Sequence, residues 1–490
     1  MTSDSAARHV PIAIVGSGFS GLGAAIQLDK AGHHDFLVLE RGDDVGGTWR
    51  DNTYPGAACD VPSHLYSYSF APNPNWTRWL PSRAEIQDYL CGVARDSGVL
   101  DRHVFGCAVK DAAWNDGQRR WELLTDRGRL TSDMVISAFG ALAEPSLPNI
   151  PGVNRFDGEL FHSARWNHDL DLSGKRVAVV GTGASAVQIV PAIADVAAHI
   201  DVYQRTAPWL LSRHERPFRR AEQRAFGCVP GLARLMRAGI YVNREALIIG
   251  LAKAPRLMIP LELALRAKIR AEVKDPELRR KVTPDFRLGC KRMLLSNAWY
   301  PTLGRDHVEL ITEGIREVDG HRIITVDGVA RATDAIVLAT GFHVTDSPMF
   351  DIIRDADGRT LAQTCADKGR QAYKGTTIAG FPNMFFMLGP NTAVGHTSMV
   401  YMIESQLNYI VDAIGTMKAR GLKAVEVRRE VQDVYNAKLQ RKLAGSVWNS
   451  GGCASWYLDA HGNNTTLWPD FTFRFRSQTK RFDLDAYTTS

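Results

Sequence analysis

The feature that most constrains the fold is a repeated pattern of an apolar strand, a glycine-rich turn, a helix and a second strand. The first copy begins with residues 12–15 (IAIV) and the turn 16–21 (GSGFSG), and the second with 177–180 (VAVV) and 181–186 (GTGASA). The first glycine of such a turn bends the chain, the second lets the backbone approach a pyrophosphate, and the third position lets helix and strand pack closely. The pyrophosphate lies at the helix N-terminus, where free N–H groups favour negative charge. Because each turn stands between a strand and a helix, the sequence predicts an α/β fold with two Rossmann-like dinucleotide-binding domains.

The residue that ends the second strand differs between the two copies. Glu40 lies 24 residues after Gly16, and Arg205 lies 24 residues after Gly181. A carboxylate at this place accepts hydrogen bonds from ribose hydroxyls, which suits FAD. A guanidinium pairs with a 2′-phosphate, which suits NADPH better than NADH. We therefore expect FAD on the first copy and NADPH on the second.

Composition excludes several other classes. The chain is 45% hydrophobic and 23% charged, as in a soluble globular protein. Its net charge of +6 comes from scattered Lys and Arg without a basic stripe, so we expect no nucleic-acid partner. No apolar run reaches the roughly 18 to 20 residues that a membrane span requires, so we expect no integral membrane segment.

The cysteines carry a further expectation about the compartment. Seven of them stand at positions 59, 91, 107, 228, 290, 365 and 453, an odd number, widely spaced and without a CxxC pair. This spacing argues against a disulfide framework and against a dithiol redox enzyme. The first ten residues also lack the apolar core of a secretory signal. We therefore expect a cytoplasmic protein in a reducing environment.

Two further segments resemble fingerprints of the type I Baeyer–Villiger monooxygenases, relatives of the flavin-containing monooxygenases. Residues 156–166 (FDGELFHSARW) are similar to the pattern FxGxxxHxxxW, although Asn167 stands where the family has Pro or Asp. Residues 46–60 (GGTWRDNTYPGAACD) match the second fingerprint at every fixed position. Trp166 favours the Baeyer–Villiger branch over the branch that oxidises amines and sulfides. Residues 334–342 are similar to the family's ATG segment, where the chain returns to the FAD domain.

The resemblance implies an FAD-dependent, NADPH-consuming monooxygenase that uses O2. It would convert a small hydrophobic ketone to an ester or lactone through a C4a-peroxyflavin. Two alternatives stay open: an N- or S-oxygenating flavin monooxygenase acting on a substrate such as a thioether, and an NADPH–flavin reductase that feeds a partner protein. The substrate itself depends on the insertion and on loops near residues 392–401 and 448–456, and the oligomeric state is equally open.

Family motifs also assign roles to individual residues. Arg292 matches the catalytic arginine, whose permanent charge would stabilise an anionic peroxide, and Asp60 matches the acid that orients it. On the FAD side the cofactor-binding residues are Gly16, Gly18, Phe19, Ser20, Gly21, Glu40, Arg41, Gly47, Thr48, Trp49, Tyr54, Asp60, Val61, Tyr66, Thr340, Gly341 and Asn391. On the NADPH side they are Gly181, Thr182, Gly183, Ala184, Ser185, Arg205, Thr206 and Lys291. Phe156, Gly158, His162 and Trp166 form the fingerprint at a hinge between the two domains. No metal is expected.

The expected domain organisation is discontinuous. A chain of 490 residues exceeds what one core usually supports and suggests about three units. Residues 1–145 and 342–490 would form the FAD-binding domain, and residues 146–212 and 285–341 the NADPH-binding domain. The segment 213–284, rich in Leu, Ala and Arg with helical periodicity, would be a helical insertion.

Overall fold

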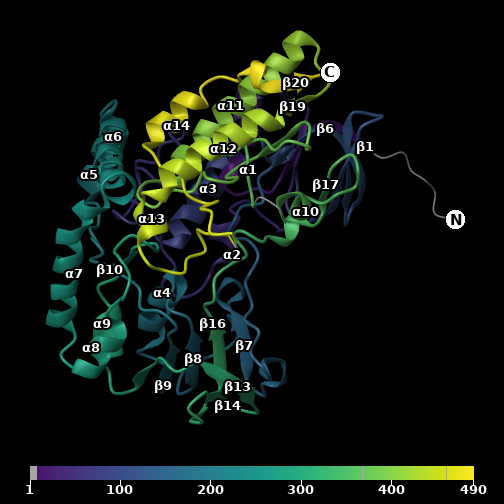
Figure 1. Cartoon of the computed structure of the whole chain (residues 1–490). Helices are drawn as coiled ribbons and strands as arrows, with labels where there is room; N and C mark the ends of the chain where they lie inside the picture. The colour runs from purple at the N-terminus through teal and green to yellow at the C-terminus, as the bar shows by residue number, and fades with distance from the viewer. Residues whose placement is uncertain (1–7, 367–368, 460) are drawn as a thin grey trace.

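The computed structural model describes residues 8–366, 369–459 and 461–490, and both predicted βαβ units are present in it (Figure 1). The first unit lies at the centre of a mixed eight-stranded sheet with the order β17-β4-β5-β6-β1-β2-β3, in which β18 also pairs with β6. Its strands are β1 (Arg8–Val15), β2 (Phe36–Leu39), β3 (His103–Val104), β4 (Val109–Asn115), β5 (Arg120–Thr125), β6 (Gly128–Ser137), β17 (Ile353–Arg354) and β18 (Met384–Phe386). The apolar run in β1 is buried because its side chains pack into hydrophobic cores on both faces of the sheet, while β2 and β6 flank it in parallel.

Helices cover this first sheet. Helix α1 (Phe19–Lys30) connects β1 to β2, and the long helix α11 (Met399–Arg420) packs against it, so that a Cβ at Gly23 would lie 3.0 Å from Leu407. The other helices of this part are α2 (Thr48–Asp51), α3 (Arg83–Asp96), α10 (Leu361–Ala366), α12 (Arg429–Ala444), α13 (Val447–Ser450) and α14 (Thr472–Gln478). The last strands, β19 (Val425–Val427) and β20 (Tyr487–Thr489), pair with each other near the C-terminus. Segments from both ends of the chain therefore build one core.

The second unit lies in a five-stranded parallel sheet with the order β12-β9-β8-β16-β7. Its strands are β7 (Glu159–His162), β8 (Arg176–Val180), β9 (His199–Tyr203), β12 (Val308–Ile311) and β16 (Ala335–Leu338). Helices α4 (Ala184–Ile193) and α9 (Trp299–Leu303) share a hydrophobic core with one face of the sheet. The other face packs on a meander of β13 (Ile315–Asp319), β14 (Arg322–Thr325) and β15 (Ala330–Ala332).

Two neighbouring chain segments connect the sheets. Residues 144–146, which follow the first sheet, run antiparallel to residues 341–343, which follow β16. Ser146 donates its N–H to the carbonyl of Gly341 at 2.9 Å, and His343 donates to the carbonyl of Glu144 at 2.9 Å. The Thr340 hydroxyl donates to the carbonyl of Ser146 at 2.6 Å. Through these hydrogen bonds, a displacement of one connecting segment would also displace the other.

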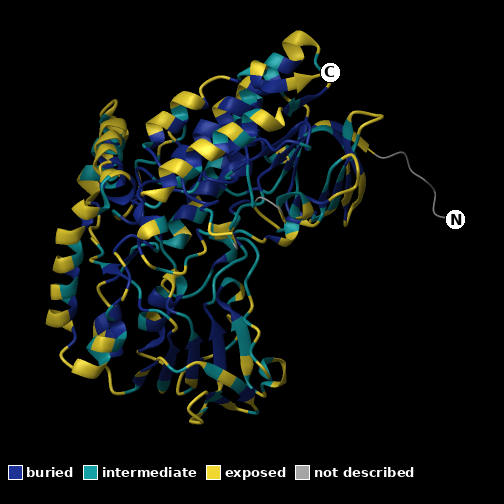
Figure 2. Cartoon of the chain, in the orientation of Figure 1, coloured by how far each residue is buried: buried dark blue, intermediate teal, exposed yellow. Residues whose placement is uncertain are grey.

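The insertion predicted between residues 213 and 284 is helical. It contains α5 (Arg220–Cys228), α6 (Leu232–Glu245), a π-helical turn η4 (Ile249–Lys253), η5 (Pro255–Met258), α7 (Ile259–Glu272) and α8 (Pro276–Val282). The pair β10 (Leu210–Leu211) and β11 (Leu294–Leu295) joins its two ends. The insertion runs along one side of the molecule and exposes its outer face (Figures 1 and 2). On its inner face, Arg237 donates to the carbonyls of His64, Leu65 and Ser67, which fixes α6 against the FAD side.

One disulfide corrects the expectation drawn from cysteine spacing. Cys290 and Cys453 are joined, with 6.2 Å between their Cα atoms, although 163 residues separate them in sequence. Spacing along the chain could not reveal this pair, because the tertiary fold brings the two loops together. A single bridge is no framework, but the inference that the cysteines are reduced is wrong for this pair. The spacing of the cysteines therefore no longer supports the expectation of a reducing compartment. In the described part of the chain, no helix is long and apolar enough to cross a membrane.

Candidate active site

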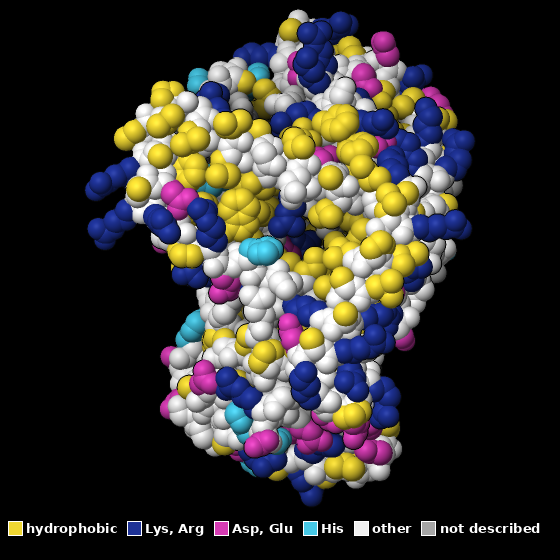
Figure 3. Space-filling view, turned by 90° about the vertical axis from the view of Figure 1, so that its left-hand side faces the viewer, with side chains coloured by type: hydrophobic (Ala, Val, Ile, Leu, Met, Phe, Trp, Pro, Cys, Tyr) yellow, Lys and Arg dark blue, Asp and Glu magenta, His cyan; other side chains and the backbone are white. Residues whose placement is uncertain are grey.

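A cavity of about 1730 Å³ contains both glycine turns in its lining. It also collects most residues that the family motifs single out. The predicted residues on its wall are Gly16, Gly18, Phe19, Ser20, Glu40, Arg41, Gly47, Thr48, Trp49, Tyr54, Asp60, Val61, Tyr66, Gly181, Thr182, Gly183, Ala184, Arg205, Thr206, Lys291, Arg292, Thr340 and Gly341. Those not on the wall are Gly21, Ser185, Asn391, Phe156, Gly158, His162 and Trp166. On the face that carries the insertion, apolar side chains border a hollow (Figure 3).

The first glycine turn fits a dinucleotide. Gly16 has φ +103°, and a Cβ on it would lie 2.6 Å from the carbonyl oxygen of Ala138. A Cβ on Gly21 would lie 1.8 Å from the carbonyl oxygen of Gly16, so any larger residue would push α1 away from β1. Gly18 begins α1 without a side-chain cap, which leaves the first N–H groups of the helix for a bound phosphate. These features are what the pyrophosphate of FAD requires.

Glu40 follows β2 and is 4% exposed. Its carboxylate accepts hydrogen bonds from the N–H groups of Ser17 at 2.7 Å and Gly42 at 2.8 Å, and pairs with Arg50 at 2.9 Å. The carboxylate is thereby fixed at the cavity wall, where the ribose of FAD would bind. The neighbouring Arg41 pairs with Glu144 and so ties this wall to the segment that connects the sheets.

The second turn repeats this geometry. Gly181 has φ +115°, and a Cβ on it would lie 2.5 Å from the carbonyl oxygen of Ala339; Gly183 begins α4 without a side-chain cap. Arg205 follows β9 and is exposed on the cavity wall near Lys291. Burial lowers the pKa of Lys291, and the positive charge of Arg205 lowers it further. Two neighbouring positive charges at a cavity wall attract an anion, which would relieve their mutual repulsion. A 2′-phosphate would be such an anion.

Arg292 and Asp60 form a bidentate ion pair at this cavity. Arg292 Nε donates to Asp60 Oδ2 at 2.9 Å, and its Nη2 atom lies 2.8 Å from both carboxylate oxygens. The pair comes from residues 232 positions apart, so only the fold brings them together. The Asp60 carboxylate raises the pKa of Arg292 further above its ordinary value. The guanidinium is therefore positively charged at any working pH and fixed in orientation.

Contacts of the second fingerprint cross between the two nucleotide folds. The Tyr54 hydroxyl donates to Gln188 Oε1 on α4 at 3.0 Å, and Gln188 Nε2 donates to the carbonyl of Ala58 at 3.0 Å. A Cβ on Gly56 would lie 2.8 Å from the carbonyl oxygen of Gln188, so a glycine is required for this approach. Trp49 donates its indole N–H to the Tyr66 hydroxyl at 3.2 Å. Gln188 was not predicted, because a single polar residue on a helix gives no signal in sequence.

The first fingerprint begins just before edge strand β7, where Phe156 and Gly158 lie, and continues through the strand into the turn after it, outside the cavity. His162 is buried, accepts a hydrogen bond from the N–H of Ala164 at 3.1 Å, and packs edge-on against Phe342. Trp166 packs against Phe161 with ring centroids 5.1 Å apart. Two residues further on, His168 Nε2 lies 2.7 Å from the hydroxyl of Thr53 in the second fingerprint. The segment thus sits beside the connection between the sheets.

The buried state of His162 predicts a pH dependence of stability. Burial lowers the pKa of His162 from 6.5 to about 4, so between these values the unfolded chain binds a proton that the folded protein does not. Stability therefore falls as pH falls through this window, by at most about 3 kcal/mol from this residue. We expect the His162→Gln variant to show a flatter decline in unfolding free energy between these pH values, measured by urea denaturation. The exposed His214→Gln variant should keep the wild-type slope, and an equal slope for both variants would contradict this explanation.

Asn391 and Tyr457 differ from what sequence reasoning suggested. Asn391, predicted to bind cofactor, lies behind the wall, where its Nδ2 atom donates to the carbonyls of Asn464 at 2.7 Å and Leu467 at 3.0 Å. Its amide therefore holds the C-terminal segment in place. Tyr457 lines the cavity and is 2% exposed. Burial raises the pKa of Tyr457 to about 12, while the nearby charge of Arg292 lowers it. Tyr457 stands directly after a predicted substrate loop, and no motif singled it out.

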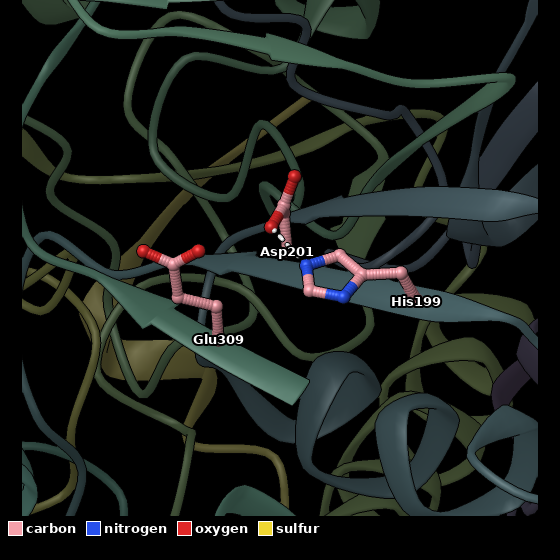
Figure 4. A group of neighbouring side chains, drawn as sticks. All are labelled: His199, Asp201 and Glu309. Atoms are coloured by element: carbon pink, nitrogen blue, oxygen red, sulfur yellow. Dashed lines mark hydrogen bonds and ion pairs between the residues drawn. The ribbon is translucent and has the colours of Figure 1, made fainter. Parts of the chain in front are cut away.

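One group of potential metal ligands occurs among the residues that the structure describes. His199 and Asp201 on β9 and Glu309 on β12 bring their ligand atoms within 4.8 Å of one another (Figure 4). His199 Nε2 lies 3.0 Å from Asp201, and Arg331 pairs with Glu309 at 3.0 Å. The guanidinium already supplies positive charge to this group. Because His199 begins β9 and Arg205 follows its end, the group lies at the opposite end of the strand from the cavity.

The geometry defines a class of protein: a flavoprotein with one nucleotide fold for FAD, a second for a 2′-phosphorylated nicotinamide nucleotide, and a fixed positive charge where the two meet. Comparisons with known proteins agree. Residues 9–218 match the family model described as flavin-binding monooxygenase-like. A Baeyer-Villiger monooxygenase of Streptomyces coelicolor is 47% identical over 481 residues, covering 98% of this chain and 92% of that protein. Another from Pseudomonas aeruginosa is 48% identical over 485 residues, with the same coverage.

Solved structures extend the comparison to the bound cofactors. The oxidized steroid monooxygenase bound to NADP is 30% identical, with a TM-score of 0.85 over 98% of this chain and 99% of that one. The OTEMO complex with FAD and NADP is 26% identical, with a TM-score of 0.88 over 99% of this chain and 100% of that one. The chain belongs to the Baeyer-Villiger monooxygenases, and it is an NADPH- and O2-dependent flavoprotein monooxygenase. The predicted fold class, family and cofactors are thereby confirmed.

Proposed function

We propose that this enzyme oxidises a small hydrophobic ketone to an ester or lactone, with Arg292 as the catalytic residue and Asp60 as its positioning partner. The observation that carries the proposal is the bidentate Arg292–Asp60 pair on the wall of a cavity that both glycine turns also line. FAD, when bound and reduced by NADPH, supplies the activated oxygen. The protein must then provide charge, orientation and exclusion of water.

Each group of residues has a distinct part in this proposal. Arg292 stabilises negative charge on oxygen through its guanidinium, which Asp60 already holds at the cavity wall, so that little reorganisation is needed. Asp60 holds the guanidinium in that orientation through two hydrogen bonds. Arg205 and Lys291 hold the 2′-phosphate of NADPH and thereby place the nicotinamide. Because Tyr54 and Gln188 tie the two nucleotide folds together, they keep the cofactors in register.

An apolar wall supports a hydrophobic substrate. The cavity that contains Arg292 is lined by both predicted substrate loops, through Ala393, Val394, Thr397, Met399 and Val400 of one and Ala454, Ser455 and Trp456 of the other, followed by Tyr457. Most of these side chains cannot hydrogen-bond a polar substrate. They would instead bind an apolar body and leave its one carbonyl to be oriented by a polar group.

A paired product assay tests the proposed reaction. Purified enzyme with NADPH and O2 would be offered a panel of ketones and a thioether of matched size, and products would be identified by mass spectrometry. We expect ester or lactone in amounts that track NADPH consumption. Sulfoxide without any ester would instead establish heteroatom oxygenation. NADPH consumption that yields only hydrogen peroxide across the whole panel would favour a reductase.

The position of the first fingerprint predicts how turnover depends on it. Removing the Trp166 ring in Trp166→Ala leaves Phe161 without its packing partner beside the connection between the sheets. We expect flavin to stay bound while turnover falls about tenfold or more, because small displacements from productive geometry are costly. Trp166→Phe should recover most of the loss. If Trp166→Ala instead loses FAD on purification, the ring supports the core and not the hinge.

A further inference from the structure

The disulfide between Cys290 and Cys453 lies at the oxygenating site. Cys290 directly precedes Lys291 and Arg292, both of which line the cavity. Cys453 directly precedes residues 454–457, which line the same cavity from the C-terminal side. The bond thus joins the loop that carries the proposed catalytic arginine to the loop that faces it. Neither cysteine has a part in the function described above.

Few contacts hold the beginning of the C-terminal loop against its neighbour. The N–H of Arg287 donates to the carbonyl of Gly451 at 3.0 Å. A Cβ on Gly451 would lie 2.6 Å from Cys290 Cβ, so the two loops touch closely at the disulfide. Further along, the wall is fixed independently, because the N–H of Ala393 donates to the carbonyl of Thr466 at 3.0 Å. Residues 456 and 457 are tied to that segment, because the Thr466 hydroxyl donates to the carbonyl of Trp456 at 3.5 Å and the N–H of Thr465 donates to the carbonyl of Tyr457 at 3.2 Å. Residues 451–455 therefore depend on the disulfide more than residues 463–468 do.

We propose that Cys290 and Cys453 are a reversible thiol–disulfide pair that controls closure of residues 451–455 over the site that contains Arg292. With the bond formed, residues 451–455 are fixed at the cavity wall, and water is kept from the site. With the bond reduced, the loop opens more often, and activated oxygen is lost as hydrogen peroxide before it reaches the substrate. The redox state of Cys290 and Cys453 thus determines what fraction of the NADPH consumed yields oxygenated product.

Burial gives the two sulfurs different parts in the exchange. Cys290 is 1% exposed, whereas Cys453 is half-buried and follows the exposed Gly452. A thiolate of an external dithiol would attack Cys453 Sγ, the disulfide would break, and Cys290 would leave as a thiolate beside the cationic Lys291. The second thiol of the reductant then displaces Cys453 and closes its own disulfide. Two electrons and two protons pass to the protein in total.

The oxidant for the reverse step comes from the reaction itself. Hydrogen peroxide released by an open site would oxidise the Cys453 thiol, reacting as its thiolate, to a sulfenic acid; the hydroxide that leaves takes up the proton lost by the thiol and becomes one water. The Cys290 thiol would then attack that sulfur, form the S–S bond and release a second water. Two thiols and one peroxide give one disulfide and two waters. An enzyme that wastes NADPH would therefore close its own site again.

The chemical state of the pair is the first measurement. Holoenzyme would be treated with iodoacetamide, either directly, after dithiothreitol, or after dithiothreitol followed by removal of reductant and addition of hydrogen peroxide. Peptides would be read by mass spectrometry, with the exposed free Cys228 as internal control. We expect Cys228 to be labelled both directly and after dithiothreitol. Cys290 and Cys453 should be labelled only after dithiothreitol without the later addition of peroxide. Labelling of the pair without reductant, or failure of peroxide to protect it again, would overturn the proposal.

The second measurement follows the loop and the peroxide. Reduction should speed hydrogen exchange in residues 451–455 and leave residues 463–468 unchanged. It should also raise hydrogen peroxide released per NADPH in the presence of a ketone by at least about fivefold, the lower end of typical coupling between two sites. The Cys453→Ser variant should behave as permanently reduced, and Cys228→Ser as wild type. Equal exchange and equal peroxide yield in oxidised and reduced wild type would refute the switch, whether or not the variant folds.

Only the peroxide readout rests on the proposed function. If no ketone is converted, but labelling and exchange respond as expected, the ketone assignment fails and the reversible pair stands. If ketones are converted with the same yield in both redox states, the function stands and the switch fails.

Discussion

The Arg292→Ala variant is expected to consume NADPH but to release hydrogen peroxide in place of ester. Reduction of flavin needs a correctly placed nicotinamide, whereas oxygen transfer needs a stabilised negative charge on oxygen, and only the second depends directly on the guanidinium. Removing one preorganised charge from such a site costs about a hundredfold to a thousandfold in the stabilised step. Stopped-flow absorbance of the flavin, first without oxygen and then on mixing with oxygen, would separate the two half-reactions.

Two further variants sharpen this result. Arg292→Lys keeps a positive charge but cannot form the bidentate contact with Asp60, so we expect it to recover only part of the ester yield. Asp60→Ala should impair both half-reactions, because Arg292 loses the two hydrogen bonds that orient it. If Arg292→Ala makes ester at near wild-type yield, Arg292 is not the residue that supports oxygen transfer.

The Arg205→Ala variant is expected to lose most of its preference for NADPH over NADH. One charge-assisted contact to a phosphate is worth roughly 1.5 to 3 kcal/mol, so the KM for NADPH should rise about tenfold to a hundredfold while the KM for NADH changes little. The remaining cation, Lys291, would account for residual preference. Steady-state kinetics with both nucleotides is the measurement.

A matched control exists on the same sheet assembly. Arg322 on β14 is exposed, pairs with Asp319 and does not line the cavity. Arg322→Ala should leave both KM values unchanged. If Arg205→Ala raises the KM for NADPH and NADH equally, then Arg205 shapes the wall and does not read the 2′-phosphate.

Local signals in the sequence were enough for the two nucleotide folds. Gly16, Gly21 and Gly181 occupy positions where a Cβ would collide with backbone atoms. The need for glycine at these positions could therefore be predicted from the spacing of the motif alone. Glu40 and Arg205 follow equivalent strands, β2 and β9, and their opposite charges predicted different ligands. The boundaries between the domains stay a prediction, at 145/146, 212/213, 284/285 and 341/342. We propose the outer two because the first sheet draws no strand from residues 146–341, and the inner two because all elements between residues 213 and 284 are helical.

Other parts of the site depend on contacts that no local pattern encodes. Cys290 and Cys453 lie 163 residues apart, and the rule that relates cysteine spacing to disulfides does not apply to a pair made by tertiary packing. Gln188 contacts Tyr54 across two folds, and Asn391 uses its amide on the C-terminal segment. These contacts depend on how helices and loops pack in the folded protein, and the packing cannot be predicted from local patterns in a single sequence.

Isotope transfer from O2 tests the central claim most directly. The enzyme would be supplied with NADPH, a hydrophobic ketone that it converts, and oxygen gas carrying a heavy isotope, and the ester or lactone would be analysed by mass spectrometry. We expect one heavy oxygen atom in each product molecule, placed between the carbonyl carbon and the carbon that migrated. Product whose inserted oxygen comes only from water would contradict the assignment.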